Sequence, residues 1–209
     1  ELCSLLLDPA LRRGGHGALL SKSRFLFMAE HRARFAAKVI AELRGVTDES
    51  GLSPFWEGLG RHFFSMDYSR ADYLTGIGRK SFIAELMPKY PLYAKLLSPE
   101  AQAAIGQTHA QTVPARRLLE SEGFRYEGLV DIFDAGPVLE IDVDDVGAVR
   151  HAHRYVVHTG LATGDRPWLV SNTSLKDFRA TVVTGGAWGE EFPLPGEARA
   201  ALGVRPGDL

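Results

Sequence analysis

Residues 2–44, LCSLLLDPALRRGGHGALLSKSRFLFMAEHRARFAAKVIAELR, decide the fold that the sequence predicts. The apolar run Leu2–Leu7 is typical of a buried strand. A glycine-rich loop follows it, then residues 18–37 favour a helix and residues 38–44 favour a second strand that stops at Gly45. A strand–helix–strand crossover of this kind joins neighbouring parallel strands, so we expect an α/β fold.

Helices and strands continue to alternate up to about residue 150. Pro54 and Pro114 each open an expected helix, because proline is favoured in the first helical turn. The order proline, helix, glycine, aromatic strand occurs at 54–64 and again at 114–126, which suggests two similar halves. The other expected elements are a strand from Phe63, several short helices over 69–106, and strands over 126–133 and 138–143.

The character of the chain changes after Arg150, where short β-prone pieces alternate with turns rich in Gly, Asp and Pro. These pieces lie at 154–158, 168–171 and 181–184. We therefore expect two regions, residues 1–150 and a small β-rich C-terminal extension over residues 151–209. The last stretch, from Gly185, is expected to be loosely ordered.

The composition is that of a globular protein with no nucleic-acid or membrane partner. Hydrophobic residues make up 45% and charged residues 24% of the 209 residues, and the net charge is −2. This charge gives no basic field for nucleic acid, and no apolar run approaches the roughly 20 residues that span a bilayer. The single cysteine, Cys3, excludes an internal disulfide, is expected to be a buried packing thiol, and fits a cytoplasmic protein.

The start of the sequence also carries an expectation. The chain begins at Glu1 rather than at a methionine, and it enters the first expected strand at once. No signal-peptide pattern comes before that strand. We therefore expect the C-terminal part of a longer protein whose N-terminal strands are missing.

The loop before the first helix has the residues of an anion-binding turn. Gly14, Gly15 and Gly17 let the backbone turn tightly and approach a ligand. Unpaired N–H groups at a helix N-terminus favour a bound phosphate. Arg12 and Arg13 add attraction for an anion, and His16 is placed to touch it.

This loop resembles the coenzyme A loop of GNAT acyltransferases. It lacks the Walker A pattern, and Leu20 stands where a dinucleotide-binding loop has its third glycine. Arg12, Gly15 and Gly17 match the GNAT pattern [R/Q]xxGx[G/A]. The resemblance implies a GNAT-like mixed sheet with flanking helices, in which the loop binds the pyrophosphate of an acyl-CoA.

Longer segments resemble the arginine N-succinyltransferase family over roughly residues 1–150. They are ELCSLLLDP (1–9), SKSRFLFMA (21–29), KVIAELRGVTDESGLSPFWEGLGRHFFSMDYSRADYL (38–74), KSFIAELMPKYPLY (80–93) and IGQTHAQTVPARRLLESEGFRYEGLVDIFDAGP (105–137). The resemblance implies transfer of a succinyl group from succinyl-CoA to the α-amino group of L-arginine, the first step of an arginine breakdown route. It also implies that Leu5 contacts succinyl-CoA and that His109 is the proton donor.

The residues around His109 suit that role. This histidine lies in a polar stretch just before the helix start at Pro114, and loops on a rigid scaffold often carry catalytic groups. A group that titrates near neutral pH can take a proton from the attacking amine or give one to the leaving thiolate. A backbone N–H near Leu5 could polarise the thioester carbonyl. His151 and His153 are spaced for one face of a strand, but nothing completes a metal site with them, so no metal is expected.

Binding the two substrates requires charged groups of both signs. A guanidinium is best held by carboxylates, and a succinyl carboxylate by a cation. The candidates for the guanidinium are Glu42, Glu85, Asp131 and Asp134, and those for the succinyl group are Arg44, Arg61 and Lys80. The aromatic group Phe55, Trp56, Phe63 and Phe64 is expected in the core instead.

Two alternatives stay open at this point. The acceptor could be ornithine or another amine, with the same chemistry. The chain could also be a non-catalytic CoA-binding fragment or subunit that needs a separate N-terminal half. A homo-oligomer or hetero-oligomer is compatible with either alternative.

Overall fold

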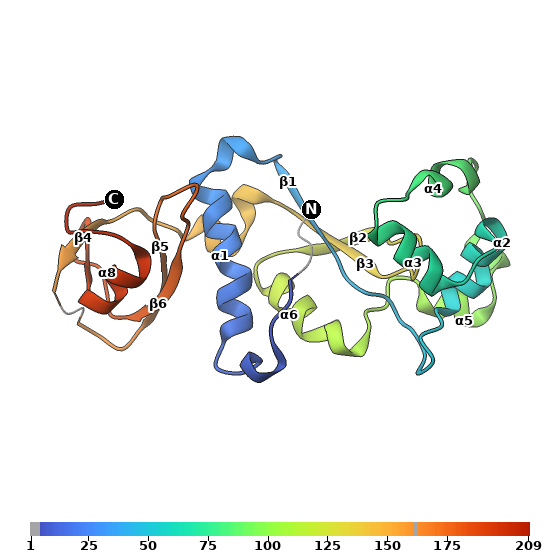
Figure 1. The fold of residues 1–209 in the computed structure, drawn as a ribbon, viewed down its shortest axis with the longest axis horizontal. Coiled ribbons are helices and arrows are strands. Elements are labelled where there is room, and N and C mark those ends of the chain that lie inside the picture. Colours follow the sequence, from blue (N-terminus) through green and yellow to red (C-terminus); the bar gives the residue numbers. More distant parts are fainter. Residues whose placement is uncertain (1–4, 161–162) are drawn as a thin grey trace. The chain divides into compact units, whose positions relative to one another are not determined.

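The computed structural model describes residues 5–160 and 163–209, which form a mixed α/β structure with three small sheets (Figure 1). The α-helices are α1 (His16–Glu30), α2 (Arg61–Phe64), α3 (Tyr68–Gly76), α4 (Ser81–Leu86), α5 (Pro99–Ala104), α6 (Val113–Ser121), α7 (Gly147–Arg150) and α8 (Gly196–Leu202). The strands are β1 (Lys38–Glu42), β2 (Arg125–Val130), β3 (Pro137–Asp142), β4 (Val156–Thr159), β5 (Pro167–Ser171), β6 (Ala180–Thr184) and β7 (Glu191–Leu194). None of these helices is long and apolar enough to cross a membrane.

The chain divides into two compact units. The described part of the first unit runs from residue 40 to residue 141 and contains most of the three-stranded sheet, in the order β1-β3-β2. The second unit combines residues 5–39 with the described residues from 142 onward. It therefore joins α1 to the C-terminal strands β4–β7.

In the first unit, β2 and β3 form an antiparallel hairpin. Tyr126 lies opposite Leu139 and Val130 lies opposite Pro137, with an irregularity in register between these two pairs. Gly128 lies in this interval with a φ of +94°, a value that glycine adopts at little cost. The predicted strands over 126–133 and 138–143 are thus confirmed, although β2 ends three residues earlier than expected.

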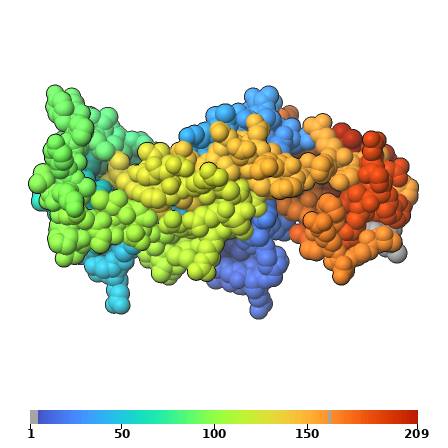
Figure 2. Space-filling view, turned by 180° about the vertical axis from the view of Figure 1, so that it is seen from behind, coloured from blue at the N-terminus to red at the C-terminus, as the bar shows by residue number. Residues whose placement is uncertain are grey.

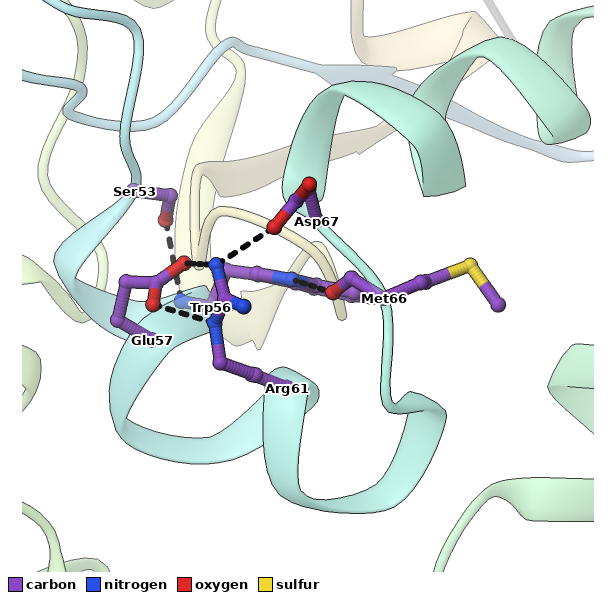
Figure 3. Close-up of polar contacts among 6 residues, drawn as sticks. All are labelled: Ser53, Trp56, Glu57, Arg61, Met66 and Asp67. Atoms are coloured by element: carbon purple, nitrogen blue, oxygen red, sulfur yellow. Dashed lines mark hydrogen bonds and ion pairs between the residues drawn. The ribbon is translucent and has the colours of Figure 1, made fainter.

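The aromatic core of the first unit is built around Trp56. The indole is fully buried and stacks between Phe64 and Phe133, with ring centroids 5.3 and 5.4 Å apart. Its Nε1 donates to the carbonyl oxygen of Met66 at 3.0 Å, so the buried polar atom is satisfied (Figure 3). The prediction that this aromatic group belongs to the core is confirmed.

The strand predicted from Phe63 is wrong, because those residues continue a helix. Trp56–Gly60 form a π-helical turn, η3, and α2 follows it directly. Gly60 has helical angles, so it does not end the helix. Arg61 bonds Glu57 one turn earlier at 2.9 Å and Asp67 at 2.8 Å, which supports this turn (Figure 3). The expected order of helix, glycine and strand therefore occurs only in the second of the two places, at α6, Gly123 and β2.

In the second unit, α1 confirms the predicted first helix but is shorter than expected. It ends at Glu30 because His31 leaves the helical region, with φ −110° and ψ 37°. The strand predicted over Leu2–Leu7 falls partly outside the described residues. Residues 5–7 are not in a strand, and no described strand pairs with them; Leu6 is 80% exposed. An unpaired segment cannot satisfy its backbone groups through a ladder, so it does not count as a strand. Cys3 also lies outside the described residues.

The C-terminal residues are rich in β-structure, as predicted. β4 pairs with β7 in parallel, and β5 pairs with β6 in an antiparallel hairpin. The expectation of a loose end after Gly185 is wrong, because β7 and α8 both lie there. Phe192, Leu194 and Leu202 are at most 4% exposed and complete the core of this unit, which gives the end of the chain a reason to be ordered.

The π-helical turn leads to a stability prediction. A Cβ atom at Gly60 would collide with the ring of Trp56, so we expect Gly60→Ala to cost about 1–3 kcal/mol in the free energy of unfolding. Gly76, near the end of α3, has open space where its Cβ would be, so Gly76→Ala should be neutral or stabilising by up to about 1 kcal/mol. Urea unfolding of both variants tests this contrast, and equal effects would contradict the packing described for Trp56.

Candidate functional site

The turn between β2 and β3 is organised by a buried carboxylate, that of Asp134. Asp134 is only 5% exposed to solvent. Oδ1 accepts the N–H of Gly136 at 2.8 Å, and Oδ2 accepts the N–H of Gly45 at 2.8 Å. One carboxylate thus connects the segment after β1 to the hairpin turn, and each of its two oxygens accepts a backbone N–H.

Close backbone packing accompanies these bonds. A Cβ at Gly45 would collide with Asp134, and a Cβ at Gly136 would collide with the carbonyl oxygen of Leu43. Ala135 is fully buried with a φ of +54°, and its carbonyl oxygen accepts the N–H of Gly106 at 2.9 Å. The turn therefore holds two other segments, residues 43–45 and the start of the loop at Gly106.

His109 lies three residues further along this loop and is half-buried. Its N–H donates to the carbonyl oxygen of Arg44 at 2.9 Å, next to the Gly45 that Asp134 holds. Its ring caps a 3-10 turn, since Nδ1 accepts the N–H of Gln111 at 3.2 Å. Both the backbone and the ring of His109 are therefore positioned by bonds within the first unit.

The capping bond determines which ring nitrogen of His109 carries hydrogen. Nδ1 uses its lone pair to accept from Gln111, so the neutral ring has its hydrogen on Nε2. Nε2–H is then a hydrogen-bond donor that a reacting atom could use. This tautomer follows from the hydrogen-bond network.

A group of ionisable side chains lies near the same turn, in the first unit. The pKa of Asp131 is raised by burial, and the neighbouring charges of Asp134 and Asp72 raise it further. Its Oδ1 accepts the N–H of Phe133 at 2.7 Å. Burial, with the charges of Asp134 and Asp72, raises the pKa of Tyr68 to about 12, so this phenol stays protonated at neutral pH. Tyr68 also packs edge-on against Trp56.

Sequence reasoning missed Tyr68 and Asp72. They lie four residues apart on α3, so they share a face of that helix. Ala71, beside them, is fully buried in the cluster that contains Phe133, which brings this face to the turn after β2. An Asp and a Tyr at helical spacing are too common in sequences to have indicated this by themselves.

The other predicted substrate-binding residues differ in their partners and in their exposure to solvent. Asp134 uses both oxygens within the fold, and Arg61 is paired with Glu57 and Asp67. Arg44 is exposed and donates to Thr47 at 3.4 Å. The remaining candidates, Glu42, Glu85 and Lys80, are also exposed.

The predicted glycine loop belongs to the second unit and lies at its surface, in the dark-blue part of the chain (Figure 2). Gly14 and Gly15 have φ values of +66° and +81°, and Gly15 is the N-cap residue of α1. The first helical bond runs from Leu19 to Gly15, so the N–H groups of the first turn are not used by the helix. The first turn of α1 contains no acidic residue, which would repel an anion.

The side chains of the loop have different roles. Arg12 folds back, with Nε donating to the carbonyl oxygen of Leu7 at 3.0 Å. His16 folds back as well, since Nδ1 lies 3.1 Å from the carbonyl oxygen of Leu11 and must be the donor in that bond. Arg13 and Gly14 are exposed, and Gly17 is half-buried at the start of α1. Arg12 and Arg13 are thus both exposed cations of this loop.

The remaining predicted positions are Leu5, His151 and His153. Leu5 is 41% exposed and lies outside any strand, so the strand geometry expected around it is not present in the described chain. In the described residues, no group of three or more His, Cys, Asp or Glu side chains could hold a metal ion.

Comparison with known proteins gives consistent matches over the whole chain. The family model described as "Arginine N-succinyltransferase beta subunit" matches residues 1–148, and the model of its C-terminal domain matches residues 153–209. The protein named arginine N-succinyltransferase of Enterobacter sp. (strain 638) is 55% identical over 100% of this chain and 61% of that protein. The protein of the same name from Salmonella newport (strain SL254) is 54% identical over the same shares.

One solved structure is also similar. It is described as the arginine/ornithine succinyltransferase subunit AI from Pseudomonas aeruginosa, with a TM-score of 0.86 and 36% sequence identity. The match covers 97% of this chain and 58% of that one. The chain thus spans about three fifths of the length of the curated relatives that it matches.

The raised pKa of Asp131 predicts a pH effect on stability. A carboxylate whose pKa is raised in the folded state binds protons more tightly there than in the unfolded state, so its contribution to stability is lost as pH rises through its folded pKa. Asp131→Asn keeps an oxygen for the N–H of Phe133 but cannot ionise. We expect wild type to lose stability relative to this variant as pH rises above about 4, measured by thermal unfolding at several pH values. A wild-type protein that instead gains stability over the variant would show that the charge is stabilised.

Proposed function

The chain belongs to the arginine N-succinyltransferase beta subunit family, and from this premise we propose that it transfers a succinyl group from succinyl-CoA to the α-amino group of L-arginine. The observation that carries the proposal is the match of both family models, which together span almost the entire chain. The hydrogen bonds that position His109 support the proposal independently, because they hold in place a ring that can assist proton transfer.

The proposed reaction is a direct acyl transfer. The neutral α-amine attacks the thioester carbonyl and forms a C–N bond, the C–S bond then breaks, and the amine nitrogen loses one proton while the CoA sulfur gains one. No oxidant or metal is needed to balance this step. Holding both substrates together supplies much of the rate, because it removes the entropy cost of their encounter.

His109 is proposed as the group that assists the leaving thiolate. In the capped state, its Nε2–H can donate a hydrogen bond to the sulfur as negative charge develops. Complete proton transfer from an imidazolium requires Nδ1 to exchange the bond from Gln111 for a proton. The cap is long enough, at 3.2 Å, for such an exchange to cost little.

The glycine loop is proposed to bind the pyrophosphate of succinyl-CoA. The unused N–H groups of the first turn of α1 suit a doubly charged anion, and Arg13 adds a cation at the surface. Arg12 supports the loop by its bond to Leu7 and can still present further N–H groups. Gly14, His16 and Gly17 complete the proposed loop, and Leu5 is retained as a proposed contact of the acyl-CoA. We further propose that the sheets and flanking helices are of the GNAT type.

For the acceptor, Asp131 is the proposed carboxylate for the guanidinium. Ionised Asp131 is disfavoured by its burial and by its acidic neighbours, so a cationic ligand would relieve that cost. Arg44 is the proposed cation for the succinyl carboxylate, since its carbonyl oxygen holds His109 and its side chain is exposed. Ornithine is a second candidate acceptor, because the name of the similar solved structure includes it.

The first experiment is an assay of thiol release from succinyl-CoA, with and without arginine. We expect arginine-dependent release by wild type. His109→Asn should lower kcat by about 10²–10⁴-fold, because Asn can still cap the turn but cannot transfer a proton. His109→Ala should lose both the activity and the cap, and it should therefore also be less stable than His109→Asn.

Three outcomes bear on the proposal. Near-normal kcat in His109→Asn would exclude a role for the imidazole in proton transfer. Succinyl-CoA binding without any thiol release by wild type would mean that this chain needs another polypeptide for activity. Neither binding nor release would contradict the proposed function of this chain.

The loop is tested by a pair of variants at Gly15. Its φ of +81° is strained for a β-branched residue but accessible to asparagine. Gly15→Val should therefore weaken CoA binding at least about tenfold, whereas Gly15→Asn should stay close to wild type. Isothermal titration calorimetry with CoA measures both. Unchanged affinity in Gly15→Val would place the pyrophosphate elsewhere.

The acceptor assignment predicts a selective kinetic effect. Asp131→Asn should raise KM for arginine at least about tenfold, because the guanidinium loses its charged partner, while KM for succinyl-CoA stays constant. Steady-state kinetics with arginine and ornithine as competing acceptors give both values and the preference. A KM for arginine that does not change in this variant would remove Asp131 from the acceptor site.

A further inference from the structure

The second unit contains a cavity that the proposed acyl transfer does not use. It has a volume of about 390 Å³, in the range of pockets that hold small molecules. Its lining comes from α1, from the segment between α7 and β4, from strands β4, β5 and β7, and from α8 and the residues near it. All of these belong to the same compact unit, so the cavity is a property of that unit.

One wall of the cavity is aromatic and apolar. Trp168 and Phe192 meet edge to face with centroids 5.6 Å apart, and Tyr155 lies 5.7 Å from Phe192. Trp168 is held by its Nε1, which donates to the carbonyl oxygen of Gly185, and Arg166 lies over its ring at 5.1 Å. Such a wall is fixed in place and suits a flat apolar group.

The lining of the cavity also contains basic side chains. Among the Asp, Glu, His, Lys and Arg side chains of its described lining, Glu30 is the only acidic one, and the others are His151, His153 and Arg154. Arg154 bonds both carboxylate oxygens of Glu30, at 3.2 and 3.0 Å, which neutralises that acid. The Arg154 side chain is 61% exposed and that of Glu30 only 20%, so the guanidinium extends from a buried partner toward solvent.

Arg154 retains capacity for a second anion. A guanidinium has five N–H groups, and the bonds to Glu30 use two of them. The other N–H groups form part of a rigid fork that matches a carboxylate. His153 precedes Arg154 in the lining and packs against Tyr155, whose ring in turn contacts Phe192 of the aromatic wall.

From this juxtaposition we propose that the cavity binds a small organic carboxylate with an aromatic or branched apolar body. The carboxylate lies on Arg154 and His153, and the apolar body lies against Trp168 and Phe192. The volume accommodates a ligand of this size and is too small for an entire coenzyme A. This site is separate from the glycine loop, and binding at it does not depend on acyl transfer.

The test uses 4-fluorophenylacetate as the probe and fluorine NMR of the probe as the measurement, with the complete chain. The probe signal should broaden or shift on addition of wild type. Arg154→Gln should weaken binding at least about tenfold, because it removes the charged fork. Ala152→Trp should also block binding, because Ala152 lines the cavity yet is exposed, so a larger side chain fills the opening without disturbing the core.

Two controls make the result specific. Arg179→Gln removes an arginine of the same unit that is also paired with a carboxylate, Asp177, but lies outside the cavity, so it should bind the probe like wild type. The uncharged analogue 2-(4-fluorophenyl)ethanol should bind at least about tenfold more weakly than the probe. Circular dichroism melting of each variant shows whether the unit is still folded.

The proposal is overturned by any of three results. Wild type that shows no binding up to about 10 mM probe excludes this class of ligand. Binding that is unchanged in folded Arg154→Gln and Ala152→Trp places the probe elsewhere. Equal binding of the alcohol and the carboxylate shows that the cavity selects only apolar surface. All three results concern binding alone, so they leave the proposed acyl transfer unaffected.

Discussion

The first unit depends on one interaction, the pair of hydrogen bonds from Gly45 and Gly136 to the buried carboxylate of Asp134. A hydrogen bond to a charged acceptor contributes about 1.5–3 kcal/mol to stability. If a buried carboxylate oxygen lost its donor, the free-energy cost of its desolvation would no longer be offset. The two glycines are required because side chains there would occupy the space of the turn or of the neighbouring backbone. The charge of Asp134, the backbone conformation of the turn and the close packing at the two glycines all favour the same arrangement. Together they determine where the segment after β1 contacts the β2–β3 hairpin.

The position of His109 follows from that junction. Arg44 precedes Gly45, so the carbonyl oxygen that receives the His109 N–H is held by the neighbouring bond to Asp134. The capping bond from Gln111 then orients the ring. Asp134 is thus a structural carboxylate that positions the histidine through the backbone. Asp131, whose Oδ1 accepts the N–H of Asp134 at 3.2 Å, has a pKa raised by burial, and a bound cationic ligand would lower it. The two carboxylates of this turn have different roles because the oxygens of Asp134 hold the backbone of Gly45 and Gly136, whereas Asp131 accepts N–H groups of its own turn with Oδ1 and lies close to the charges of Asp134 and Asp72.

The sequence indicated the mixed α/β class, most of β2, β3 and α6, the β-rich C-terminal region and the family, and each of these has a local cause. Pro114 lies in the first turn of α6, and Gly15 of the glycine loop is the N-cap of α1. The failures came from effects of tertiary structure. Gly60 suggested a helix end, but the ring of Trp56 needs a residue without a Cβ there, so the glycine remains within the helix. The role of Asp134 was not predictable, because its partner Gly45 is 89 residues away in sequence and a buried carboxylate has no local signature.

The positioning of His109 by Asp134 is tested most directly by amide hydrogen exchange at His109 in the variant Asp134→Asn. The substitution replaces one acceptor oxygen by a donor, so one of the two glycine N–H bonds must be lost. We expect faster exchange at Gly45 or Gly136 and, through Arg44, at His109, with no change at Asn172, whose N–H is bonded within the second unit. Unchanged exchange at His109, with Gly45 exchanging faster, would contradict the claim that the buried carboxylate positions the histidine.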